Sequence, residues 1–131
     1  MPVSSGPSTF SSGAPLLFAG ELALDSGFRC IYCDRYLLES IDSFDLWEND
    51  HLEPTSRGGE DNLQNMALSC RLCNKIKRHW VPADLMSLDR AGRIRAAREY
   101  VEEGRRRKEA YLDSVKAILR ENSELPREPS S

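Results

Sequence analysis

Apolar residues recur along this chain with two different periods, and the change of period separates its helices from its strands. Over residues 16–24 the spacing is helical, and Gly27 is a typical residue for ending that helix. A β-prone run over residues 44–52 is long enough for one strand, and residues 66–68 can form a short returning strand. Proline and glycine within residues 54–59 open a loop between the two strands.

Helical spacing returns after the second strand. Ser69 or Cys70 can cap a helix that runs to about His79, and Pro82 stops it. Beyond that proline the chain is charged and helical, and Gly104 marks a break. Its apolar stripe consists of Ile94, Ala97, Val101, Tyr111, Val115 and Ile118. Strand, loop, strand and helix form a ββα unit, so the pattern predicts an α+β fold with a small ββα core flanked by an N-terminal helix and C-terminal helices.

Composition marks the boundaries of this core. Residues 1–14 are rich in Ser, Gly and Pro, which is typical of a disordered tail, and residues 123–131 are expected to fray. Between the tails we expect a core over residues 15–80 and a helical extension over residues 81–122. At 131 residues the chain is one domain by length, and a core this small gains much of its stability from a structural metal.

Four cysteines form two Cys-x-x-Cys pairs, Cys30/Cys33 and Cys70/Cys73. They allow three disulfide connectivities, but residues 1–15 hold five Ser and three Pro in place of the apolar segment of a signal peptide. We therefore expect an intracellular, cytoplasmic protein, and in that compartment such motifs usually bind zinc. A redox pair would explain one motif and not both. The spacing predicts a structural zinc held by four thiolates.

The charge is unevenly distributed. A net charge of −3 argues against a nucleic-acid partner, but residues 70–80 carry four basic side chains and no acid. A second cluster, residues 105–108, has Glu neighbours that can pair with it, so we interpret it as a solvated helix face. No apolar run reaches the ~20 residues of a membrane span.

Between the two cysteine pairs lies an Asp50-His51 dipeptide, and Asn74 follows the last cysteine directly. A carboxylate and an amide oxygen suit a hard cation such as Mg²⁺ or Mn²⁺. Neighbours on a regular strand point to opposite faces, so Asp50 and His51 can address one ion only near a strand end or a bulge, which Pro54 makes plausible.

The segment Asp50–Gly59, followed by Asn65 and then by Cys70–Lys77, resembles the HNH endonuclease family, in particular its branch with two zinc knuckles. This resemblance implies a zinc-scaffolded ββα-metal core over residues 15–80 that cuts DNA with a divalent metal. It implies His51 as the general base and Asp50 and Asn74 as ligands of a catalytic Mg²⁺ or Mn²⁺. Because Asn74 stands where many relatives carry a His, the chain is an HNN variant. Asn65 takes the structural role and holds the His51 segment in place.

Double-stranded DNA is the partner that this resemblance implies, cleaved to 5′-phosphate and 3′-hydroxyl ends. The backbone contacts would come from four basic side chains of the helix after the second knuckle: Arg71, Lys75, Lys77 and Arg78. The rival interpretation is a zinc-dependent nucleic-acid-binding or protein-binding module that has lost catalysis. Whether the chain forms a homodimer is left open.

Overall fold

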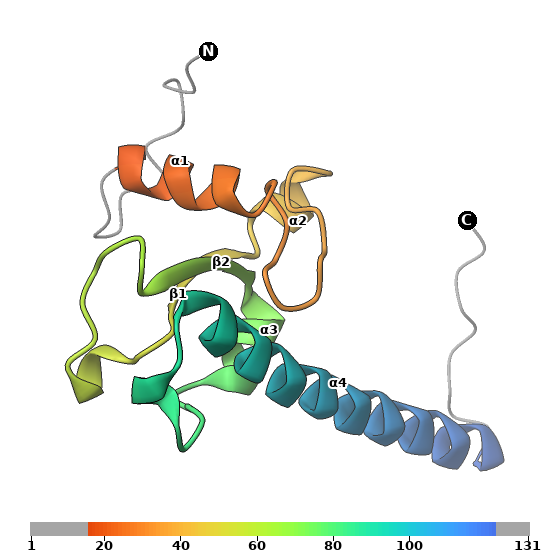
Figure 1. Cartoon of the computed structure of the whole chain (residues 1–131). Coiled ribbons are helices and arrows are strands. Elements are labelled where there is room, and N and C mark those ends of the chain that lie inside the picture. The colour runs from red at the N-terminus through yellow and green to blue at the C-terminus, as the bar shows by residue number, and fades with distance from the viewer. Residues whose placement is uncertain (1–15, 123–131) are drawn as a thin grey trace.

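The computed structural model describes residues 16–122 (Figure 1). The tails predicted over residues 1–14 and 123–131 lie outside the described residues. In chain order the elements are α1 (Leu16–Asp25), α2 (Ile41–Phe44), β1 (Trp47–His51), the 3-10 turn η3 (Thr55–Arg57), β2 (Met66–Cys70), α3 (Arg71–Lys77), the 3-10 turn η4 (Leu85–Ser87) and α4 (Arg90–Glu121). The predicted α+β class is confirmed. Within residues 16–122, no helix combines the length and the apolar character that a membrane crossing requires.

A two-stranded antiparallel sheet positions the polar residues of interest. β1 pairs with β2 in a regular register in which Trp47 faces Cys70 and His51 faces Met66. All five residues of β2 are buried, because α1 contacts this strand and α3 follows it directly and packs against both strands. β1 is half-buried except at Asp50, which is buried.

The core joins the cysteine pairs to the long C-terminal helix. Its buried members are Ala23, Cys30, Tyr32, Leu37, Leu68, Cys70, Cys73, Ala97 and Val101. Ala97 and Val101 come from α4, so the first half of that helix belongs to the core. On the same side, the Arg98 guanidinium donates to the Ile31 carbonyl at 2.6 Å and fastens α4 to the first cysteine pair.

Two boundaries differ from the sequence prediction. The strand begins at Trp47, because the residues before it form the four-residue helix α2, whose N-cap Ser40 accepts a hydrogen bond from the Ser43 amide at 3.1 Å. The helix predicted to run to about His79 ends at Lys77, because Arg78 takes a positive φ of 50°. An L-residue rarely adopts that conformation inside a helix.

The break predicted at Gly104 is wrong, because α4 runs without interruption from Arg90 to Glu121. A Cβ at Gly104 would lie 2.4 Å from Cγ2 of Ile76 on α3. The glycine therefore serves the close approach of two helices and does not interrupt one. Gly27, in contrast, has a φ of +67° just after α1, as expected of a residue that ends a helix.

Candidate active site and metal centre

Four thiols meet where the two Cys-x-x-Cys pairs come together. The Sγ atoms of Cys30, Cys33, Cys70 and Cys73 all lie within 4.8 Å of one another. Zinc with Zn–S bonds of about 2.3 Å requires a tetrahedron with edges of about 3.8 Å. Cys33 Sγ lies 3.8 Å from Cys70 Sγ, so the cluster already has the dimensions of a four-thiolate zinc site. Within residues 16–122, this is the one place where three or more His, Cys or carboxylate groups gather closely enough to hold an ion.

Because the four thiols are crowded together, their pKa values shift in different directions. Hydrogen bonding, first of all with Cys30, lowers the pKa of Cys33 to about 6, and the same sharing with Cys33 raises the pKa of Cys30. Four thiolates in one buried cluster repel one another. A divalent cation supplies the charge that lets all four ionise, so the residues present fit a structural zinc.

Backbone and side-chain donors surround the sulfur atoms. The Tyr32 amide donates to Cys30 Sγ at 3.4 Å, and the Cys73 amide donates to Cys70 Sγ at 3.5 Å at the N-terminus of α3. The Arg105 guanidinium of α4 donates to Cys73 Sγ at 3.3 Å. Such donors favour the thiolate form and orient the ligands. Arg105 thus differs from the adjacent Arg106, which bonds Glu103 at 2.7 Å as predicted for a solvated face.

The Asp50 side chain lies on the face of β1 that packs against α3, and both of its polar contacts are made by Oδ2. The Tyr32 hydroxyl donates to that oxygen at 2.5 Å, and Lys77 Nζ lies 3.2 Å from it. Burial raises the pKa of the Asp50 carboxyl, while the Lys77 charge acts in the opposite direction. Burial and the Asp50 charge together raise the pKa of Tyr32 well above its usual value, so the phenol keeps the proton that it donates.

The position of Lys77 corrects one prediction. We expected this lysine to face a phosphate backbone, but its side chain is 1% exposed. Besides Asp50, it bonds the His51 carbonyl at 3.0 Å. Because Asn74 and Lys77 are three residues apart on α3, their side chains share the face that packs on β1. Lys77 therefore holds the end of the strand in place and is not available to DNA.

His51 is the last residue of β1, and its partner is Asp61. Nε2 lies 2.6 Å from Asp61 Oδ1, and the His51 side chain is 26% exposed. The strand keeps its regular pairing through His51, so no bulge turns it towards Asp50. The two neighbours occupy opposite faces of the strand end, as alternation requires.

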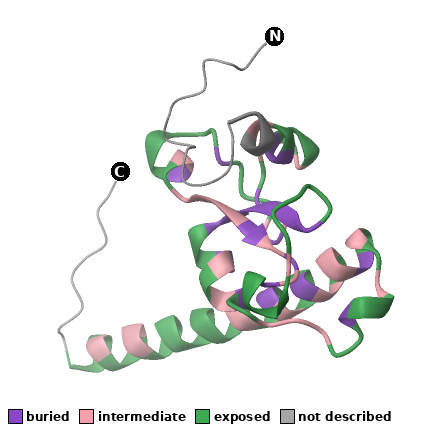
Figure 2. Ribbon diagram, turned by 90° about the vertical axis from the view of Figure 1, so that its left-hand side faces the viewer, coloured by how far each residue is buried: buried purple, intermediate pink, exposed green. Residues whose placement is uncertain are grey.

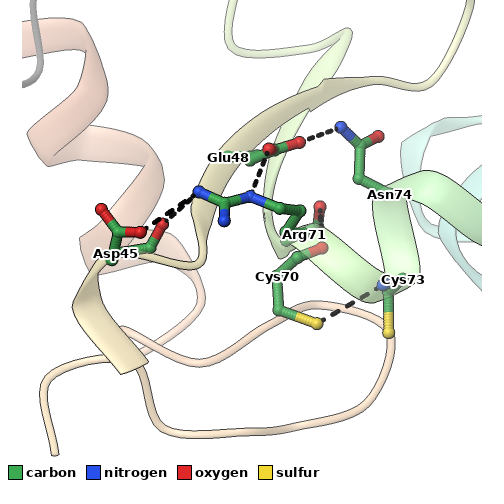
Figure 3. A network of polar contacts seen from close by, with 7 residues as sticks. Asp45, Glu48, Cys70, Arg71, Cys73 and Asn74 are labelled. Carbon is green, nitrogen blue, oxygen red and sulfur yellow. Dashed lines mark hydrogen bonds and ion pairs between the residues drawn. The ribbon is translucent and has the colours of Figure 1, made fainter. Parts of the chain in front are cut away.

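Asn74 pairs with a carboxylate that the sequence analysis did not single out. Its Nδ2 donates to Glu48 Oε1 at 2.6 Å, and Arg71 Nε donates to Glu48 Oε2 at 3.3 Å (Figure 3). Arg71 also donates to the Asp45 carbonyl at 2.7 Å. The cation of Arg71, expected to meet DNA, is thus shared between two acidic residues of the chain. Glu48 lies two residues before Asp50, so both side chains face α3.

The loop between the strands is closed by Asn65. Its Oδ1 accepts from the Glu53 amide at 2.8 Å, and its Nδ2 donates to the carbonyls of Glu53 at 3.0 Å and Glu60 at 2.9 Å. A Cβ at Gly59 would lie 1.8 Å from the Glu53 carbonyl oxygen. Gly59 is therefore required by close approach, whereas Gly58 supplies the positive φ, +98°. These contacts fix the segment that follows His51.

Two of the four predicted DNA-binding cations remain on the surface without an ion pair within residues 16–122. Lys75 is exposed on α3, and Arg78 is exposed at its C-terminus. They do not continue the row from Arg71, because the helix ends before Arg78. Two surface cations beside Asn74 can still contact one or two phosphates.

Three polar residues of the site were missed in the sequence: Tyr32, Glu48 and Asp61. Glu48 carried a signal, because it stands at i−2 from Asp50 on a strand and must share its face. Asp61 stands ten residues from His51, and Tyr32 stands eighteen residues from Asp50, so neither carried such a local signal. Only the folded chain brings them against Asn74, His51 and Asp50.

Comparison with known proteins finds that the segment carrying this arrangement is similar to one family model. Residues 30–79 match the family model described as HNH endonuclease. The matched segment begins at the first cysteine of the cluster and includes Asp50, His51, Asn65 and Asn74. Neither a curated protein nor a solved structure matches the chain.

Proposed function

Because residues 30–79 match the family model described as HNH endonuclease, we propose that this chain is a divalent-metal-dependent DNA endonuclease that hydrolyses phosphodiester bonds. One observation carries the proposal. Within residues 16–122, each of the three catalytic candidates is fixed by a neighbour through one polar atom, and its second polar atom has no hydrogen-bond partner. Oδ2 of Asp50, Nε2 of His51 and Nδ2 of Asn74 are the fixed atoms.

His51 acts as the general base in this proposal. An ionised Asp61 can only accept hydrogen bonds, so Nε2 carries the proton and Nδ1 keeps the lone pair. A neutral imidazole in this tautomer can take a proton from an attacking water near neutral pH. Lys77 supports the role through its bond to the His51 carbonyl, and Asn65 does so by closing the loop behind it.

Asp50 and Asn74 are the proposed ligands of the catalytic metal. With Oδ2 of Asp50 held by Tyr32 and Lys77, and Nδ2 of Asn74 held by Glu48, the remaining donors are two oxygens on the face of β1 that α3 covers. A carboxylate and an amide oxygen suit Mg²⁺ or Mn²⁺. Such an ion, when bound, stabilises the charge that develops on the phosphate and on the leaving 3′ oxygen.

The opposite placement of base and ligands agrees with the geometry of the reaction. In an in-line displacement the attacking water and the leaving oxygen lie on opposite sides of phosphorus. His51 at the strand end would act on the attacking water, and a metal held by Asp50 and Asn74 on the opposite face of the strand would act on the leaving oxygen. Lys75 and Arg78 would hold the neighbouring phosphates of the duplex. The products would carry 5′-phosphate and 3′-hydroxyl ends.

Nicking of supercoiled plasmid tests the proposal. His51→Ala should lower the rate at least ~10²–10⁴-fold, the contribution of a general base, while zinc content and thermal stability stay close to wild type. The matched control is His79→Ala, which removes the other histidine, exposed beyond the end of α3, and should leave the rate unchanged. Undiminished cleavage by His51→Ala would refute the assignment. A wild-type chain that binds duplex DNA but cleaves with neither Mg²⁺ nor Mn²⁺ would establish the rival, an inactive binding module.

A further inference from the structure

The second half of α4 extends away from the rest of the described chain (Figure 1). The exposed and half-exposed ribbon in this part contrasts with the buried segments of the core (Figure 2). Five large apolar side chains nevertheless lie on it: Tyr111, Leu112, Val115, Ile118 and Leu119. Tyr111 is 74% exposed, Ile118 57% and Leu112 49%. We define these five residues as the distal stripe.

The distal stripe continues the face with which α4 enters the core. Eighteen residues are five full turns of an α-helix, so residues eighteen apart point in the same direction. Val115 therefore repeats the direction of Ala97, and Leu119 repeats that of Val101. Ala97 is 2% exposed and Val101 is fully buried. Among the residues that the structure describes, 16–122, one apolar face is thus covered over its first half and left open over its second half.

We propose that the distal stripe is an interface for a second copy of this chain, with the two α4 helices packed antiparallel about a two-fold axis. In the register that brings Leu112 against Val115 of the partner subunit, Tyr111 meets Ile118 of the partner subunit. By symmetry each of these contacts occurs twice, as in any isologous interface. The apolar face that each helix leaves open would then be covered by the same face of its partner.

Charge complementarity selects this occupant and this orientation. Glu109 and Lys116 lie along one edge of the stripe, seven residues apart. The antiparallel register places Glu109 beside Lys116 of the partner subunit, and Lys116 beside the partner's Glu109. Arg107 and Glu121 follow the other edge and meet in the same reciprocal manner. Arg107 also bonds Glu103 of its own helix at 3.3 Å, a contact on the turn before the stripe.

A parallel pair is disfavoured by the same residues. Parallel, in-register helices bring each position against itself, so Lys108 would face Lys108 of the partner subunit. In the antiparallel register Lys108 lies level with Leu119 of the partner subunit, where its aliphatic stem can cover apolar surface. Because the two helices run in opposite directions, the bodies of the two subunits lie at opposite ends of the helix pair. Residues 105–122 of each helix rise about 25 Å, the approximate length of the pair.

Sedimentation equilibrium of the full, zinc-loaded chain tests this interface. Wild type should be dimeric at about 100 μM, and Val115→Asp should make it monomeric with unchanged helix content by circular dichroism. Lys116→Glu should weaken the dimer roughly tenfold, because it replaces two attractive pairs by two repulsive ones. Glu109→Lys should do the same, and the double variant Glu109→Lys/Lys116→Glu should restore most of the affinity.

The control is a pair of equally spaced substitutions on the far side of the helix. Ala110→Lys and Ala117→Glu lie about 140–160° from Val115, and both alanines are exposed, so neither substitution should change the dimer constant. A chain that stays monomeric at ~100 μM overturns the proposal. So does a dimer that survives Val115→Asp, because its interface then lies elsewhere. A double charge variant no tighter than the single ones overturns the antiparallel register.

Discussion

Replacing Lys77 by Met tests the observation that this lysine supports the site from inside. The side chain is 1% exposed, Asp50 is 5% exposed, and 3.2 Å separate Nζ from Oδ2. At that distance the attraction at an effective dielectric constant of 20 is about 5 kcal/mol. Removing one partner of a buried pair usually costs about 3–5 kcal/mol, since the other charge is left without compensation. We expect Lys77→Met to lower the free energy of unfolding by about that amount. The variant also loses the hydrogen bond from Lys77 to the His51 carbonyl.

The loss should depend on pH in a defined direction. Burial already raises the pKa of Asp50, and the Lys77 charge opposes that rise. In Lys77→Met the folded-state pKa of Asp50 therefore moves further above its unfolded value. A carboxyl shifted in this way costs nothing at a pH below its unfolded pKa, and it costs stability as the pH rises through the folded pKa. The difference in the free energy of unfolding between wild type and Lys77→Met should therefore widen as the pH rises from about 5 towards neutrality.

Urea unfolding measures the effect, with Trp47 and Trp80 as fluorescence probes and zinc held in excess so that metal linkage is the same for both proteins. The double variant Asp50→Asn/Lys77→Met should recover part of the loss, because it buries no charge. It also keeps the test decisive if the single variant fails to fold. A single variant within ~0.5 kcal/mol of wild type would contradict the reasoning, because that is the usual effect of changing an exposed lysine.

Three further changes address the scaffold and the substrate. Gly104→Ala should lower the free energy of unfolding by about 1–3 kcal/mol, because the added Cβ would clash with Ile76. Adding Ile76→Ala in a double variant should relieve the clash. A single variant more stable than wild type would contradict the close approach of the two helices. Elemental analysis should find one zinc per chain, and Cys70→Ser should lose both the metal and the folded core; a well-folded, zinc-free variant would argue against a structural zinc. Lys75→Ala should weaken duplex binding equally on unrelated sequences and reduce the salt slope of log K by about 0.9, whereas an unchanged slope would remove this side chain from the DNA contacts.

The sequence predicted those parts of the fold that depend on neighbours in the chain. Period and composition located α1, the two strands and the start of α3, because each of these follows from local spacing and capping. The short helix α2 escaped, since four residues are too few to show a period. The early end of α3 escaped as well, because it depends on the positive φ of Arg78. Gly104 was misread for a related reason: a glycine needed for close approach looks like a glycine that breaks a helix.

The site was predictable to the same extent. Residue types and spacing gave the cysteine cluster, because its four ligands come from two local motifs that one ion can join. Spacing also put Asn74 and Lys77 on one face of a helix, but it could not say whether that face is open to solvent or packed against a strand. For Lys77 the answer is the strand. Contacts such as Tyr32 with Asp50 link residues far apart in the chain and carry no local signal.

The same distinction bears on how this acidic chain would bind DNA, the substrate that we propose for it. Two of the four cations that the sequence suggested for DNA are paired within the fold: Lys77 with Asp50, and Arg71 with Glu48 and Asp45. A cation already paired in the protein releases few counterions from DNA, so it adds little to binding. Lys75 and Arg78 remain: Lys75 lies on α3, the helix that carries Asn74, and Arg78 directly follows it. With only two phosphate contacts, one subunit would bind duplex DNA weakly. An antiparallel pair of α4 helices would strengthen the binding by bringing two subunits to the same duplex. A second copy doubles the phosphate contacts without adding a single cation to either chain, so the proposed dimer should bind duplex DNA with a steeper salt dependence than a Val115→Asp monomer.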